Sequence, residues 1–195
     1  DTNDVNLSLI HMLKSDTCRR ELNFSLAHFE EVDSHHLEQL VQGLPEKLET
    51  LELSLEGCIR IDNAGLRAFK DSGLPNSITK FHINLMGCSD IDDEGIEELA
   101  QALHALPKLN EVRLVCYMCH DLTAECFIHL NDWMPKTVKK CWIQMKGTAA
   151  ARDCKSLKEL RQAAKDRKKA NLLADAQLKA DMISGRISIP GALRN

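Results

Sequence analysis

The sequence predicts an α/β solenoid, a curved arc in which strand–helix units repeat along the chain. Three observations predict it: an apolar ladder recurs at a nearly fixed period, a strand-like alternation opens each unit, and a helix-like spacing closes it. The first rungs of the ladder lie 29, 30, 31 and 29 residues apart. The first, second and third rungs are, respectively, Leu22, Leu51, Phe81, Val112 and Cys141; Phe24, Leu53, Ile83, Leu114 and Ile143; and Leu26, Leu55, Leu85, Cys116 and Met145.

The first half of each unit is expected to be a strand. Residues 51–55 and 81–85 alternate strictly between apolar and polar side chains, which is typical of a strand with one buried face. Gly57 and Gly87 follow these strands, and glycine permits a tight turn there.

The second half of each unit is expected to be a helix. Apolar residues three apart, such as Leu66 and Phe69, give the helix a buried stripe. A residue type favoured at helix N-caps precedes each stripe, and a proline ends it. These residues are Asp33, Asp62, Asp92 and Thr123 at the N-caps, and Pro45, Pro75, Pro107 and Pro135 after the helices. The fifth unit is degenerate, because its helix residues Leu157 and Leu160 are displaced by one position.

The repeat pattern resembles that of the leucine-rich-repeat family. Residues 48–58 read L-x-x-L-x-L-x-L-x-G-C, and the resemblance extends over about residues 18–163. The long units are most similar to the ribonuclease-inhibitor and cysteine-containing subtypes, since Cys58, Cys88 and Cys119 stand where many members place asparagine or cysteine. The resemblance implies parallel strands on the concave face, helices on the convex face, and a binding rather than a catalytic role.

Three segments are expected along the chain. Residues 1–17 form an N-terminal cap, residues 18–163 form about five repeats, and residues 164–195 form a helical extension and an extended arm. A glycine at 185 is expected to stop that helix, and residues 186–190 are expected to be extended.

Charge is distributed unevenly along the chain. Residues 152–195 carry 11 Lys and Arg against 5 Asp and Glu, a net charge of +6, whereas the rest of the chain carries −10. The basic run 165–169 has no aromatic neighbours and fits a solvated helix, so nucleic acid is not the expected partner. A nucleic-acid-binding adaptor acting through this segment remains an alternative.

The cysteines favour a reducing compartment. Several of the eight replace core aliphatic residues in the ladder, and free cysteine behaves as a small apolar side chain. Disulfide frameworks occur mainly in much shorter secreted chains. With no transmembrane segment or signal peptide visible, the expected location is intracellular, in the cytoplasm or in an organelle matrix or stroma.

One motif matches a chemical signature. Cys116-Tyr-Met-Cys119-His120 has the C-x-x-C-H form of haem attachment, and Cys126 nearby would permit a zinc site. Repeat register alone explains both Cys116 and Cys119, so a core role is the preferred interpretation, and a redox, haem or metal protein is the alternative. We find no other catalytic motif and expect no enzyme activity, cofactor or metal.

The expected function is protein binding, as an interaction module or as an accessory or scaffold subunit of a larger assembly. Homo-oligomers are not expected. Arginine and the large aromatic residues dominate interface hot spots, and they gather in the last two units. The candidate contacts are His82, Arg113, Val115, Tyr117, Lys140, Trp142 and Gln144 on the concave face, and Leu172, Leu173, Ala176, Ile183, Ile187 and Ile189 in the C-terminal segment. The alternative for Trp142 is that the C-terminal segment folds back over it as a cap.

Overall fold

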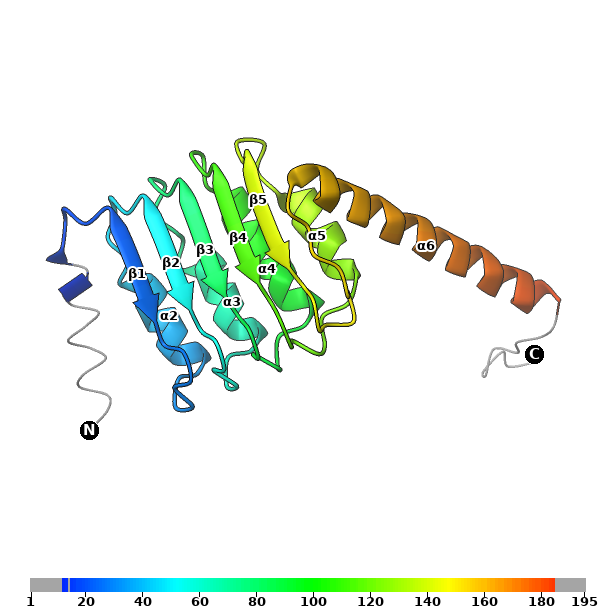
Figure 1. Ribbon diagram of the computed structural model, residues 1–195, viewed down its shortest axis with the longest axis horizontal. Coiled ribbons are helices and arrows are strands. Elements are labelled where there is room, and N and C mark those ends of the chain that lie inside the picture. Colours follow the sequence, from blue (N-terminus) through cyan, green and yellow to red (C-terminus); the bar gives the residue numbers. More distant parts are fainter. Residues whose placement is uncertain (1–11, 14, 185–195) are drawn as a thin grey trace, which may run out of the picture.

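Five parallel strands form one open sheet in the computed structural model, which describes residues 12–13 and 15–184 (Figure 1). The strands follow one another in chain order as β1 (Glu21–Ser25), β2 (Thr50–Ser54), β3 (Lys80–Asn84), β4 (Glu111–Val115) and β5 (Lys140–Gln144). The helices between them are α2 (Ser34–Gln42), α3 (Asn63–Asp71), α4 (Asp93–His104) and α5 (Glu125–Trp133), and α6 (Leu157–Ile183) follows β5. The predicted α/β solenoid is confirmed.

The strand register confirms the apolar ladder. Leu22 pairs with Leu51, Leu51 with Phe81, and the pairing continues through Val112 to Cys141. Alternate strand residues point between the sheet and helices α2 to α5, where they form one continuous core. Leu51, Phe81 and Ile83 are at most 2% exposed. Each unit therefore buries its apolar surface against its neighbours, as stacked repeats do.

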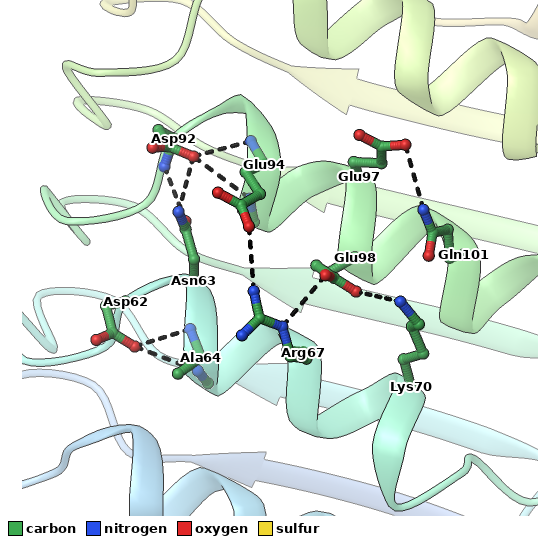
Figure 2. Close-up of polar contacts among 12 residues, drawn as sticks. Asp62, Asn63, Ala64, Arg67, Lys70, Asp92, Glu94, Glu97, Glu98 and Gln101 are labelled. Atoms are coloured by element: carbon green, nitrogen blue, oxygen red, sulfur yellow. Dashed lines mark hydrogen bonds and ion pairs between the residues drawn. The ribbon is translucent and has the colours of Figure 1, made fainter.

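A polar ladder joins the helix N-termini on the edge of the solenoid. Asp62 accepts hydrogen bonds from the backbone of Ala64 and Gly65, and Asp92 caps α4 in the same way (Figure 2). Asn63 donates to the Asp92 carboxylate and accepts from the Asp92 backbone, at 2.8 and 3.1 Å. The first residue of one helix is therefore bonded to the N-cap of the next.

The prediction that Thr123 caps α5 was wrong. The N-cap is Ala124, which makes no side-chain cap hydrogen bond. Both the backbone and the hydroxyl of Thr123 donate to the Asp93 carboxylate, while the hydroxyl accepts from the backbone of Glu125. The helix begins one residue later than the pattern predicts, although Thr123 keeps the bond to the preceding helix that Asp62 and Asp92 also make. The predicted N-caps Asp33, Asp62 and Asp92 are confirmed.

A row of cysteine thiols forms hydrogen bonds between neighbouring repeats. Cys58, Cys88 and Cys119 each donate to the carbonyl of the third rung in the preceding unit, at 3.0 to 3.2 Å. Phe29 stands at the equivalent position of the first unit but is 60% exposed. A phenylalanine cannot donate this bond, and the first unit has no preceding repeat to receive it.

Thiol accessibility gives a direct check of this core. All eight cysteines are free, and only Cys18 is exposed. Burial raises the pKa of Cys88 and of Cys141 to about 12, which suppresses the reactive thiolate. We expect one thiol to react with Ellman's reagent in the folded protein and eight in denaturant. The Cys18→Ser variant should lose the native reaction, and rapid reaction of several thiols in that variant would contradict the packing.

An ion-pair cluster links α3 to α4 on the helical side. Glu98 lies 2.6 Å from the Lys70 ammonium and 3.2 Å from the Arg67 guanidinium, and Arg67 also contacts Glu94 (Figure 2). The hydrogen bond from Lys70 is the largest influence on the pKa of Glu98. Together with the bond from Arg67, it holds that pKa below the ordinary value of 4.5 against the opposing effect of burial.

This cluster predicts a pH-dependent stability difference. A carboxyl whose pKa is lower in the folded state stabilises the protein at pH values above its pKa in the unfolded chain. This stabilisation is lost as the pH falls through the pKa of the folded state. Glu98→Gln should therefore cost ~1 kcal/mol at pH 7, since both cations are partly solvated, and nothing once the carboxyl is protonated. Urea titrations of both proteins from pH 7 to pH 3 measure the difference. A gap that stays constant over this range would show that the ion pairs do not cause it.

Helix α6 docks by its first half and projects beyond the solenoid by its second (Figure 1). Leu160, Ala163 and Ala164 are buried, and Arg167 and Lys168 pair with Glu125 and Asp132 of α5 at 2.8 Å. The helix crosses the boundary predicted after residue 163 without a break. It ends at Ile183, so the predicted stop at 185 and the arm at 186–190 lie outside the described residues. No helix in the described segments is long and apolar enough to span a membrane.

Candidate functional site

The face of the sheet opposite helices α2 to α5, here called the open face, carries the outward strand residues. The register aligns three rows of these residues across the five strands. The rows are Asn23, Glu52, His82, Arg113 and Trp142; Ser25, Ser54, Asn84, Val115 and Gln144; and Glu21, Thr50, Lys80, Glu111 and Lys140. The outward residues of neighbouring strands therefore align, as the register of the apolar ladder requires.

A chain of polar contacts crosses this face. Asn23 donates to Glu52 at 2.9 Å, and His82 lies between Glu52 and Glu111, with ring nitrogens 3.2 and 3.1 Å from their carboxylates. Glu111 is also 3.4 Å from the Lys140 ammonium. These contacts hold one side chain from each of the first four strands. The polar groups of these side chains therefore already bond to one another.

The chain of contacts ends beside a depression at the last two strands, here called the C-terminal depression. It encloses about 390 Å³. Its lining consists of His82, Glu111, Val112, Arg113, Lys139, Lys140, Cys141, Trp142, Lys155 and Ser156. Strands β4 and β5 supply the floor, and the segment that leads into α6 supplies the rim. Four of the predicted contacts, His82, Arg113, Lys140 and Trp142, are brought together here.

Trp142 and Arg113 form the centre of the C-terminal depression. The Arg113 guanidinium lies 4.6 Å from the centroid of the Trp142 ring, within the range of a cation–π contact. Trp142 nevertheless keeps 41% of its surface exposed. The stacked guanidinium holds the indole in place and leaves its apolar surface available for contact. Helix α6 projects away from β5 (Figure 1), and the exposure of Trp142 shows that the described part of α6 does not cap it.

The depression combines this aromatic with an excess of positive charge. Lys139, Lys140 and Lys155 are exposed on its rim. Glu111 is the single carboxylate among its lining residues. Burial opposes the ionisation of Glu111, but hydrogen bonds from Lys140 and His82 outweigh it, so the pKa of Glu111 lies below its ordinary value. Glu111 therefore stays ionised and orders Lys140, while Lys139 and Lys155 make no ion pair with a described residue.

The other predicted contacts on the open face lie elsewhere. Val115 lines a smaller hollow of about 170 Å³ over the middle strands. Gln144 donates to the Tyr117 hydroxyl at 3.3 Å, which places this pair at the carboxyl end of the strands, apart from the depression. The predicted concave-face set is therefore spread along the open face, and His82 and Arg113 line both hollows.

Lys139, Lys155 and Ser156 were missed by the sequence analysis. Lys139 directly precedes Lys140 in the chain, and this adjacency is the sequence signal for it. Lys155 and Ser156 reach the depression because the chain reverses after β5, where Ile143 and Cys154 exchange backbone hydrogen bonds of 2.8 Å. Nothing in the repeat pattern indicates that reversal.

The two cysteines of the C-x-x-C-H motif lie in the core, whereas His120 is exposed. Cys116 and Cys119 are both fully buried, Cys116 as the third rung of its unit and Cys119 in the row of thiols. Burial raises the pKa of Cys116 well above its ordinary value. Among the described residues, no three His, Cys, Asp or Glu side chains are placed to hold a metal ion. Packing therefore explains both cysteines of the motif.

The C-terminal contacts lie on the projecting half of α6. Leu172, Leu173 and Ile183 are 71, 62 and 89% exposed, and Ala176 is exposed as well. These side chains are not docked on the solenoid. The other two predicted contacts, Ile187 and Ile189, lie outside the described residues.

Comparison with solved structures identifies the architecture. A structure titled "Leiomodin-1 Actin-Binding Site 2" superposes with a TM-score of 0.55 and 15% identity over 92% of this chain and 98% of that one. The C-terminal domain of tropomodulin from Caenorhabditis elegans gives a TM-score of 0.51 and 12% identity, over 88% and 98% of the two chains. The chain has a leucine-rich-repeat-like fold.

The remaining comparisons are less informative. A chain of the yeast Rad7 and Elc1 complex gives a TM-score of 0.46 and 14% identity, and the match spans 84% of this chain but only 32% of that one. No family model and no curated protein matches the sequence. At these identities the similarity is one of fold, and function must be argued from the side chains.

Proposed function

We propose that this chain is a non-catalytic protein-interaction module that binds its partner in the C-terminal depression. The observation that supports this most strongly is Trp142, 41% exposed and held by Arg113 on a rigid strand. Tryptophan and arginine are the residue types most enriched among interface hot spots. A partner that covers the exposed part of this fixed indole would displace the water that still contacts it.

The expected partner segment is acidic and carries an apolar side chain. Lys139, Lys140 and Lys155 on the rim complement carboxylates, which accelerates encounter, and the indole surface complements an apolar group. The first four strands offer fewer open contacts, because Asn23, Glu52, His82 and Glu111 already bond to one another. The partner is therefore expected at one end of the open face.

The projecting half of α6 is proposed as a second contact. Its exposed leucines and Ile183 are not covered by the solenoid. A partner held at both the depression and α6 would suit an accessory or scaffold subunit of a larger assembly, whereas the depression alone would suit a transient module. Size-exclusion chromatography of a native extract separates the two forms, since a free chain of 21.9 kDa would exclude a permanent subunit.

We also infer membership of the leucine-rich-repeat family, in the long cysteine-containing type, and a reducing intracellular compartment. The row formed by Cys58, Cys88 and Cys119 supports the subtype. The seven buried free thiols support the compartment. A chain designed for an oxidising environment would not keep so many thiols in its core without pairing them.

Quantitative pull-down from native extract tests the proposal. The full chain and its Arg113→Gln/Lys139→Gln/Lys155→Gln variant are immobilised, and the bound proteins are compared by mass spectrometry. A matched control, Lys47→Gln/Lys108→Gln/Lys136→Gln, removes three exposed cations away from the depression. We expect an acidic protein to be lost with the first variant and retained with the control. Purified actin is included as a defined probe, because the Leiomodin-1 structure is titled an actin-binding site. Equal capture by both variants would refute the proposed site.

A further inference from the structure

Helix α6 presents a long exposed face that the C-terminal depression does not use. Its opposite side faces α5, because Leu160, Ala163 and Ala164 are buried there and Asn171 donates to Glu125 at 2.8 Å. With 3.6 residues per turn, the side turned away from α5 is defined by this spacing. This outer face of α6 consists of Lys158, Arg161, Lys165, Lys169, Leu172, Ala176, Lys179 and Ile183, all of them exposed.

The outer face contains no carboxylate over its whole length of ~40 Å. The four acidic residues of α6, which are Glu159, Asp166, Asp175 and Asp181, lie at other angles around the helix. None of the five cations makes an ion pair with a described residue. Arg167, on the side that faces α5, and Lys168, at the edge of that side, are paired with α5. The segregation leaves a strip of positive charge open to an external anion.

The two halves of the outer face differ in chemistry. The half nearer the solenoid is basic, with Lys158, Arg161, Lys165 and Lys169. The projecting half is mainly apolar, with Leu172 at 71% and Ile183 at 89% exposure, and Leu173 beside them is 62% exposed. Large apolar side chains at such exposure are costly in water unless another surface covers them.

We propose that the outer face of α6 binds an anionic lipid surface. Clustered lysines and arginines are attracted to the negative charge of acidic headgroups, and exposed leucines on the same helix enter the boundary between headgroups and acyl chains. Because Leu160, Ala163, Ala164 and Asn171 face α5, the outer face points away from it, and a flat surface can reach the outer face without meeting α5. Charge and apolar exposure thus act on one surface, independently of the C-terminal depression, and a lipid surface would occupy the projecting half of α6 in place of the second protein contact.

The apolar half decides between a lipid surface and a nucleic acid. Phosphates attract the cations equally well in either case, but the leucines gain nothing from a sugar–phosphate backbone. Proteins that grip single strands add aromatic platforms, and α6 contains no aromatic residue. A lipid interface is the partner that uses both halves of the face.

Vesicle flotation with the full chain tests the proposal. The probes are vesicles of phosphatidylcholine alone and vesicles of phosphatidylcholine mixed with phosphatidylserine, each at low and high salt. We expect binding only to the mixed vesicles, weakened by salt. Lys158→Gln/Arg161→Gln/Lys165→Gln/Lys169→Gln should bind at least ~10-fold less, and Leu172→Ser/Leu173→Ser/Ile183→Ser several-fold less. The matched control Lys47→Gln/Lys108→Gln/Lys136→Gln/Lys146→Gln removes four exposed cations away from α6 and should float like the unaltered chain.

The outcomes separate this proposal from the proposed protein contact. No flotation with phosphatidylserine at low salt, equal flotation with both vesicles, or unchanged flotation of the quadruple variant would overturn it. Retention on duplex DNA that requires the four cations, without vesicle binding, would overturn it in favour of a nucleic-acid surface. Circular dichroism confirms that each variant is folded. Loss of protein capture by depression variants would leave the lipid result unaffected.

Discussion

Replacing Leu53 or Ile83 with alanine is expected to lower the free energy of unfolding by ~2–5 kcal/mol. Both are second rungs of central strands, 3% and 2% exposed, and both belong to the continuous core. Removal of the side chain leaves a cavity between packed layers that relax only partly. Because each unit buries its surface against its neighbours, the loss should lower the stability of the whole array.

Urea denaturation followed by circular dichroism measures this effect. Lys108→Ala is the matched control, since Lys108 is exposed and lies between α4 and β4. The control should change stability by less than ~0.5 kcal/mol. If the core variants unfold at the same urea concentration as the control, Leu53 and Ile83 do not lie where the register places them.

Replacing Trp142 with alanine is expected to weaken partner binding by ~2 kcal/mol or more. The indole carries the open apolar surface of the C-terminal depression, and Arg113 loses its stacking partner when it is removed. Stability should change much less than binding, because Trp142 is 41% exposed and does not belong to the core. Isothermal titration with the captured partner and thermal denaturation of the free chain measure the two effects separately.

Two variants of the open face serve as controls. Asn23→Ala lies in the same row as Trp142 but four strands away, and Ser54→Ala lies in the middle hollow. Both should bind normally. Normal binding by Trp142→Ala together with easier unfolding would make Trp142 a structural residue, and the contact would then have to be sought on the helices or on α6.

The strand register was predictable because one repeat constrains the next. Leu51, Phe81 and Val112 occupy equivalent positions, so stacking the units fixes which strand residues pair and which side chains face outward. The same logic placed His82, Arg113 and Trp142 in one row and assigned Cys116 and Cys119 to the core.

Features that depend on contacts outside the repeat period were not predictable. The start of α5 at Glu125, one residue after the position that the repeat indicates, has no equivalent in α3 or α4. Lys155 enters the depression through a chain reversal after β5 that has no equivalent in the earlier units. The basic run 165–169 was expected to be solvated, but Arg167 and Lys168 within it pair with α5. The repeat pattern shows which residues occupy equivalent positions, but it does not show which ion-pair partner a charged side chain will have.

Site-specific photo-cross-linking tests the proposed contact most directly. A benzoylphenylalanine is placed at Lys139 on the rim of the C-terminal depression, at Ser25 on the far strand of the open face, or at Gln101 on helix α4. Each full-length chain is irradiated in native extract, and the adducts are identified by mass spectrometry. We predict that one acidic protein is cross-linked from Lys139 and not from Ser25 or Gln101. Adducts to the same protein from Ser25 or Gln101, with none from Lys139, would contradict a partner site in the C-terminal depression.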